Sequence, residues 1–249
     1  MTIELIIIGA IFAFCAAVQS AVGFAFSLFS NTLFLLAGIP LPETILLSAL
    51  GSALQRTVMT FNLWQHVEWR KVIPLRAVCA ITLPIGIFTL RHFANLDTNI
   101  IKIAMGLLVL TILTIQIVWR VNPKPHLHWA WGVVAATTSG FLNGVSNNGG
   151  PPLILWVHAH DWPPGRSRVT TMAITMLLTP LQLALLFFAF GRGITPPMAQ
   201  IYMLIPAILI GTAIGLNIGK HLSRSRLRLI ALTLLAIISI TAIAEPLLR

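Results

Sequence analysis

The sequence predicts an all-α polytopic membrane protein, on the evidence of its composition and its long apolar runs. Of the 249 residues, 57% are hydrophobic and only 9% are charged, and the mean hydropathy is +0.91. Soluble domains carry roughly 25% charged residues, so this composition excludes an ordinary water-soluble enzyme. Runs such as IIKIAMGLLVLTILTIQIVW are apolar on every face, whereas the strands of a membrane β-barrel alternate between apolar and polar residues.

Turn residues and charges divide the chain into ten apolar segments. A helix needs about 20 apolar residues to span the bilayer, so we expect eight to ten transmembrane or half-membrane helices. The segment at 149–158 is too short to span. The segments lie near 3–19, 22–38, 43–63, 72–91, 99–119, 128–146, 149–158, 168–190, 197–219 and 227–247.

The chain contains a weak internal repeat. GIFTLRHF from Gly86 resembles GLNIGKHL from Gly215, and each half opens with an apolar segment that is broken by a polar stretch, QSAVG at 19–23 and NGVSNNGG at 143–150. Chance similarity among membrane sequences is the alternative. We favour a first helical repeat at 1–121, a central loop at 122–127 and a second helical repeat at 128–249.

Loop charge favours one topology. The net charge is +10, which in a membrane protein marks cytoplasmic loops rather than a nucleic-acid partner. If each broken pair of segments returns to its starting side, eleven Lys and Arg residues fall on one side and four on the other. The loops at 64–71, 120–127, 159–167 and 220–226 are then cytoplasmic, and the two repeats are inverted, a common transporter plan.

The stretch SNNGGPP at 146–152 is the most informative motif. We expect Gly149 and Gly150 to free the backbone, Asn147 and Asn148 to cap, and the two prolines to occupy the first turn of a short helix. Such a helix start inside the membrane would bind an anion through its N–H groups and dipole. These four residues and Asn143 are predicted to bind substrate, and a larger residue at Gly150 is expected to crowd the backbone. An interfacial turn without a ligand is the alternative.

The first break carries a second set of candidate substrate residues: Gln19, Ser20, Gly23 and Asn31. Close helix packing through small polar residues is the alternative. If the two broken elements face each other near the midplane, they build one polar cavity.

Arg56 lies deep in its segment, and an anion is a natural partner for an intramembrane arginine. Snorkelling or structural pairing is the other interpretation.

The remaining ionisable residues suggest no catalysis. All six carboxylates lie at segment ends or in loops, which argues against cation transport through buried carboxylates. HExxH and GxSxG motifs are absent, and the HAHD and HLH stretches are edge histidines rather than metal ligands. We therefore expect neither an enzyme nor a metal or cofactor site. The carboxylates are Glu4, Glu43, Glu68, Asp97, Asp161 and Glu245.

Four motifs resemble those of the TauE/SafE sulfite exporter family: VGFAFSL at 22–28, HVEWR at 66–70, NGGPPLILW at 148–156 and WPPGRSRVT at 162–170. The resemblance covers essentially the whole chain. It implies a two-repeat, multi-pass transporter of the cell inner membrane that moves sulfite, sulfoacetate or another organosulfonate. By position it marks Gly23, Asn148, Gly149, Gly150 and Arg168 as site residues. This sequence has a single glycine in the first break, where many relatives are glycine-rich.

The partners expected are therefore a small sulfur-containing anion and the lipid bilayer, with no nucleic acid. Association into a homo-oligomer stays open, as do the direction of transport and its energy coupling. Two rivals remain: a transporter or channel for another small substrate or ion, and a non-transporting membrane subunit.

Overall fold

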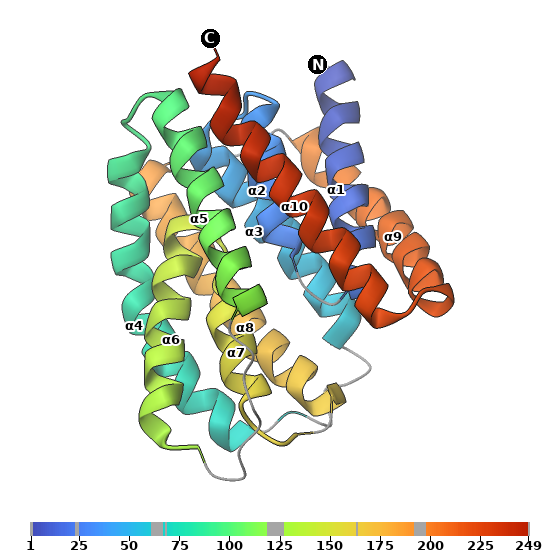
Figure 1. Cartoon of the computed structure of the whole chain (residues 1–249). Coiled ribbons are helices and arrows are strands. Elements are labelled where there is room, and N and C mark those ends of the chain that lie inside the picture. Colours follow the sequence, from blue (N-terminus) through green and yellow to red (C-terminus); the bar gives the residue numbers. More distant parts are fainter. Residues whose placement is uncertain are drawn as a thin grey trace. The chain divides into compact units, whose positions relative to one another are not determined.

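The structure is a computed structural model that describes residues 2–22, 25–60, 67, 69–118, 127–162, 164–191 and 198–248. Ten helices form this part of the chain, and no strand element occurs in it. Their boundaries follow the ten predicted apolar segments closely, so the all-α prediction is confirmed. The helices are α1 (Thr2–Val22), α2 (Phe26–Leu36), α3 (Leu41–Thr60), α4 (Trp69–Phe93), α5 (Thr98–Val118), α6 (Trp129–Ser146), α7 (Gly150–His158), α8 (Pro164–Phe190), α9 (Met198–His221) and α10 (Arg224–Leu247) (Figure 1).

Helix length separates spanning from non-spanning elements. Within the described residues, six helices are long and apolar enough to cross a membrane, namely α1, α4, α5, α8, α9 and α10. Helices α2 and α7 contain 11 and 9 residues. At about 1.5 Å per residue they reach about 17 Å and about 14 Å, well short of a hydrocarbon core of about 30 Å. The prediction that the segment at 149–158 is too short to span is confirmed.

The chain divides into two compact units, and each draws on both predicted repeats. The first unit comprises Met1–Gln55, Ala94–Leu113 and Gly193–Arg249, and the second comprises Arg56–Phe93 and Thr114–Arg192. Which helices pack together is a different question from which segments repeat, so the predicted boundaries at 121 and 128 stay predictions.

In the first unit, α1 packs against α9, and α2 packs against α1 and α10. The core of this unit is rich in phenylalanine: the rings of Phe12 and Phe34 meet edge-on at 5.1 Å, and Phe12 also stacks on Phe26. Helices α1 and α9 approach closely because Gly211 and Gly215 have no side chain. A Cβ on either glycine would overlap the backbone of α1 at Ala13 or Ala17.

In the second unit, α4 packs against α6 and α8, and α7 packs against α6 and α8. The α4–α6 contact is again made through glycines. A Cβ on Gly86 would overlap the carbonyl oxygen of Phe141, and one on Gly140 would overlap the backbone of Cys79. Small residues at helix contacts are typical of membrane helix packing.

The two glycine contacts match the internal repeat. Gly215 of α9 meets Ala17, which lies two residues before Gln19, while Gly86 of α4 meets Phe141, which lies two residues before Asn143. Gly86 and Gly215 are also the first residues of the two similar stretches in the sequence. Two different pairs of helices, α1 with α9 and α4 with α6, therefore make a similar glycine contact, one in each unit, while the repeat itself stays a prediction.

An ion pair within the first unit was not predicted. Lys102 Nζ of α5 lies 2.7 Å from Glu245 Oε2 of α10, and the lysine is 7% exposed. One turn further along α5, Gly106 lies against the backbone of Ser239. Lys102 is one of the four basic residues counted on the less basic side, and the structure places it near the start of α5 with a carboxylate partner.

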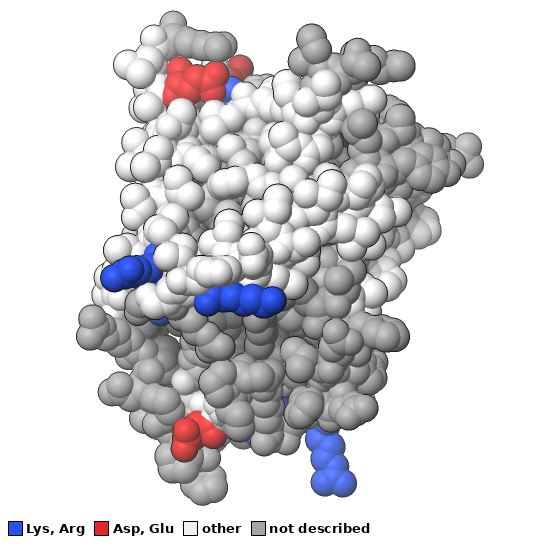
Figure 2. Space-filling view, turned by 90° about the vertical axis from the view of Figure 1, so that its right-hand side faces the viewer, with Lys and Arg blue, Asp and Glu red and all other residues white. Residues whose placement is uncertain are grey.

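Large apolar side chains cover the outside of the helices. In α9 and α10, the exposed fractions lie between 55% and 66% for Ile210, Leu229, Ile237 and Ile240. Figure 2 shows a broad uncharged area on one face, with Lys and Arg side chains at its edge. Exposed apolar surface on spanning helices is the surface that contacts lipid.

Candidate functional site

The break between α6 and α7 is built by a left-handed asparagine. Asn147 has φ 53° and ψ 21° and ends α6, and its N–H donates to the carbonyl oxygen of Asn143 at 2.9 Å. Asparagine tolerates this conformation better than most residues. We had expected the two glycines to supply the unusual backbone. Instead Gly149 has an ordinary helical conformation, φ −71° and ψ −7°, so that expectation was wrong.

Gly149 is required for space rather than for flexibility. A Cβ there would lie 2.6 Å from the Ser139 carbonyl oxygen and 2.8 Å from Asn143 Cβ, while one on Gly150 would meet only Ile154 Cδ1 at 4.0 Å. The crowding that we expected at Gly150 therefore occurs at Gly149. Ser139 Oγ also donates to the Gly149 carbonyl oxygen at 2.6 Å, which ties the start of α7 to the middle of α6.

The start of α7 agrees with the prediction in part. The two prolines lie in its first turn as expected, but the N-cap residue is Gly149 and no side chain caps the helix. The asparagines therefore do not act as N-caps. Proline has no N–H, and the Leu153 N–H closes the first turn of α7 onto the carbonyl oxygen of the N-cap residue. The amide donors at this helix start that no intrahelical bond uses are therefore those of Gly149 and Gly150.

Asn148 is the most unusual residue of the break. Its side chain is 2% exposed, and neither its Nδ2 nor its Oδ1 forms a hydrogen bond with any residue that the structure describes. Leaving buried polar groups unpaired costs about 1–3 kcal/mol each, and folded proteins rarely do so. A buried amide without a partner, immediately before a helix start, indicates a position that a ligand or water occupies.

Two glutamines that hydrogen-bond to the breaks, Gln182 on α8 and Gln55 on α3, were not among the predicted site residues. Gln182 forms a double hydrogen bond with Asn143: Asn143 Nδ2 donates to Gln182 Oε1 at 3.0 Å, and Gln182 Nε2 donates to the Asn143 carbonyl oxygen at 3.0 Å. A signal was available, because SALQ at 52–55 and TPLQ at 179–182 each place a glutamine within an apolar segment.

In the first unit, side chains hold the first break in the same manner. Gln19 Oε1 accepts from the Phe26 N–H at 3.0 Å, at the start of α2. Gln55 Nε2 donates to the Ala16 carbonyl oxygen at 2.8 Å and to Ser20 Oγ at 2.9 Å. The predicted site residues Gln19 and Ser20 thus lie together, both at most 6% exposed, and both take part in bonds that shape the break.

The other predicted residues are placed as follows. Asn31 is fully buried in α2, and Arg56 is 9% exposed near the end of α3. No carboxylate in the described part of the chain forms an ion pair with Arg56. Arg168 lies in the first turns of α8, although its side chain falls outside the description, and Gly23 lies outside the described residues. Their roles in binding stay predictions.

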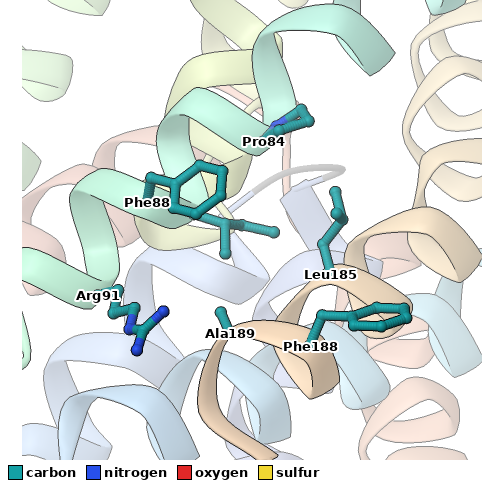
Figure 3. Close-up of a pocket in the computed structure, with 7 residues that line it drawn as sticks. Pro84, Phe88, Arg91, Leu185, Phe188 and Ala189 are labelled. Carbon is teal, nitrogen blue, oxygen red and sulfur yellow. The ribbon is translucent and has the colours of Figure 1, made fainter.

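A cavity of about 90 Å³ in the second unit has none of these residues in its lining. Figure 3 shows α4 and α8 as its walls, and it is lined by Pro84, Ile87, Phe88, Arg91, Leu185, Phe188 and Ala189. Apart from Arg91 the lining is apolar, so the cavity does not resemble an oxyanion site.

An aromatic cluster follows the end of α7. The ring of His160 lies 4.5 Å from that of Trp156 and 4.4 Å from that of Trp162, and Lys71 Nζ lies 4.3 Å from the Trp162 ring centroid. Burial lowers the pKa of His160, and the charge of Lys71 lowers it further.

Among the described residues, no group of three or more His, Cys, Asp or Glu side chains is arranged to hold a metal ion.

The helical, multi-pass character of the described chain agrees with what the sequence resemblance implies. The chain matches the family model of the sulfite exporter TauE/SafE over residues 7–242. It belongs to the TauE/SafE family. No curated protein and no solved structure was found that matches the chain. As a TauE/SafE protein it is a multi-pass membrane transporter rather than a member of an enzyme family, and its partners are a small anion and the bilayer.

Proposed function

We propose that this TauE/SafE protein carries sulfite or a small organosulfonate such as sulfoacetate across the cell inner membrane, and that the α6–α7 break binds the anion. The buried, unpartnered amide of Asn148 carries this proposal. It precedes the N-terminus of α7, where the helix dipole favours negative charge. The family match supports transport of a sulfur oxyanion.

Binding in this proposal uses few donors. The start of α7 supplies the amides of Gly149 and Gly150, and Asn148 supplies Nδ2. A sulfite ion and a sulfonate group each carry three oxygens, so these three donors can each meet one. Arg56 and Arg168 add positive charge if their side chains reach the anion.

The direct test is flux into proteoliposomes that contain the purified protein. We expect uptake of labelled sulfite or sulfoacetate above that of protein-free vesicles, and we expect Asn148→Leu to reduce it at least about tenfold, the factor that corresponds to one lost hydrogen bond of about 1.4 kcal/mol. Asn95→Leu, an exposed asparagine in the turn after α4, is the matched control. Absence of flux of sulfite, sulfoacetate and taurine in correctly inserted protein would contradict the proposal.

A further inference from the structure

The double hydrogen bond between Asn143 and Gln182 fixes the orientation of both amides. Both side chains are 1% exposed. A backbone carbonyl oxygen can only accept, so Gln182 must turn Nε2 toward the Asn143 carbonyl oxygen, as it does at 3.0 Å. Gln182 Oε1 must then face Asn143 Nδ2. Rotating either amide by 180° would bring two acceptors or two donors together.

Asn143 Oδ1 is therefore a fixed hydrogen-bond acceptor that points away from Gln182. It is buried and accepts no hydrogen bond from any described residue. Asn143 lies directly beside Gly149, since a Cβ on this glycine would lie 2.8 Å from Asn143 Cβ. A fixed, buried acceptor next to the start of α7 requires a donor, and it repels an oxygen that carries only lone pairs.

The first unit also contains a buried amide whose orientation is fixed by a backbone carbonyl oxygen, here the side chain of Gln55. Gln55 Nε2 donates to the Ala16 carbonyl oxygen, which fixes the amide of Gln55 by the same reasoning. Gln55 Oε1 is then also a fixed acceptor, fully buried and without a described partner. Two breaks that each present a fixed acceptor argue for a shared requirement rather than an accident of packing.

We propose that the substrate must itself carry a hydrogen-bond donor, and that Asn143 Oδ1, held in orientation by Gln182, accepts the hydrogen bond from it. The preferred anions are then protonated or hydroxyl- or amino-bearing: hydrogen sulfite rather than the sulfite dianion, and hydroxyalkanesulfonates rather than alkanesulfonates. Sulfoacetate carries no donor when both of its acidic groups are ionised, so among the proposed substrates it should compete more weakly than sulfite. This inference rests on the proposed function, because it assumes that a sulfur-containing anion binds at the α6–α7 break.

The test compares two sulfonates in proteoliposomes, 2-hydroxyethanesulfonate and propane-1-sulfonate. They have the same charge and the same number of non-hydrogen atoms, and they differ in a terminal hydroxyl against a methyl group. We expect the wild-type protein to prefer the hydroxyl compound by at least about tenfold in its competition with labelled sulfite, the order expected when one buried acceptor loses its hydrogen bond.

Two variants separate the acceptor from the residue that orients it. Asn143→Leu removes the acceptor and should abolish the preference. Gln182→Leu leaves the acceptor in place but lets the Asn143 amide rotate and present Nδ2, so the preference should fall below about threefold while sulfite still competes. Thr138→Val, an exposed residue on the same helix whose hydroxyl bonds to its own helix, should keep the full preference.

The outcomes are distinguishable. Equal competition by the two sulfonates in the wild-type protein would overturn the inference while leaving sulfonate transport intact. A preference that survives in both Asn143→Leu and Gln182→Leu would overturn the role of the Asn143–Gln182 pair. If no sulfur-containing anion competes or is transported, the proposed function fails and this inference fails with it. The comparison of the two sulfonates uses the wild-type protein alone, so it can contradict the inference even if one of the variants does not fold.

Discussion

Replacing Gly149 by alanine tests the α6–α7 break most directly. The added Cβ would lie 2.6 Å from the Ser139 carbonyl oxygen and 2.8 Å from Asn143 Cβ. The first distance is about 0.8 Å shorter than an ordinary van der Waals contact. Ser139 and Asn143 both belong to α6. Overpacking of this kind costs about 1–3 kcal/mol. The start of α7 must move away from α6, and the Ser139–Gly149 hydrogen bond of 2.6 Å must lengthen.

The expected effect is on binding more than on insertion. Moving the first turn of α7 by several tenths of an ångström displaces Asn148 and the two amide donors together. We expect the affinity for sulfite, measured in a binding titration or by the concentration dependence of flux, to fall at least about tenfold, since one hydrogen bond of about 1.4 kcal/mol corresponds to that factor.

The neighbouring glycine provides the matched control. Gly150→Ala adds the same methyl group one residue later, where the nearest atom is 4.0 Å away. It should insert normally and keep near wild-type affinity. If Gly149→Ala also keeps wild-type affinity, or if both variants lose it equally, the packing argument for the break is wrong.

Further predictions follow from Arg56, His160 and the loop charges. If Arg56 contacts the anion, Arg56→Gln should weaken affinity more than tenfold and Arg56→Lys less, because lysine keeps the charge but loses the planar fork; equal titration curves for all three proteins would remove Arg56 from the site. His160 has a lowered pKa in the folded protein, so the unfolded chain binds more protons, and stability should fall as the pH drops below about 6.5, the ordinary value for histidine. Melting curves between pH 5 and pH 8 should lose part of this slope in His160→Gln and keep it in His92→Gln. Cysteines placed at Gln65 and Ser223 should resist an impermeant thiol reagent applied outside intact cells, and labelling of either would reverse the proposed topology.

Much of the fold could be predicted from sequence because the membrane restricts the choices. Continuous apolar runs of about 20 residues have one common solution, a helix that satisfies its own backbone, so segment positions and helix boundaries agree closely. The short helix α7 was predicted from a count of apolar residues. The division into two compact units was not predicted, since it depends on contacts such as Gly86 with Phe141 that lie far apart in sequence.

The break between α6 and α7 lies where the sequence predicted it, but its internal geometry differs from the prediction, and its role as a binding site stays a prediction. Asparagine and glycine in NNGG were assigned by their usual roles, asparagine to the cap and glycine to the unusual backbone. The structure exchanges these roles, because Asn147 adopts the left-handed conformation and Gly149 supplies space. Side-chain identity alone does not reveal which neighbour lies within contact distance. Gln182 was missed for the same reason, as its importance depends on its distance from Asn143.

A helix break within the membrane leaves backbone N–H and C=O groups unpaired, and lipid offers them no hydrogen-bond partner. Side chains of the protein must therefore bond to them. Each unit does so with a glutamine from an adjacent helix: Gln55 reaches the Ala16 carbonyl oxygen, and Gln182 reaches that of Asn143. Both breaks are therefore held in shape without a ligand, within one unit in each case. The same bonds fix which amide atoms remain unpaired, so the residues that stabilise the break also decide what it can bind. A substitution that relaxes Gln182 should for this reason change selectivity before it abolishes transport.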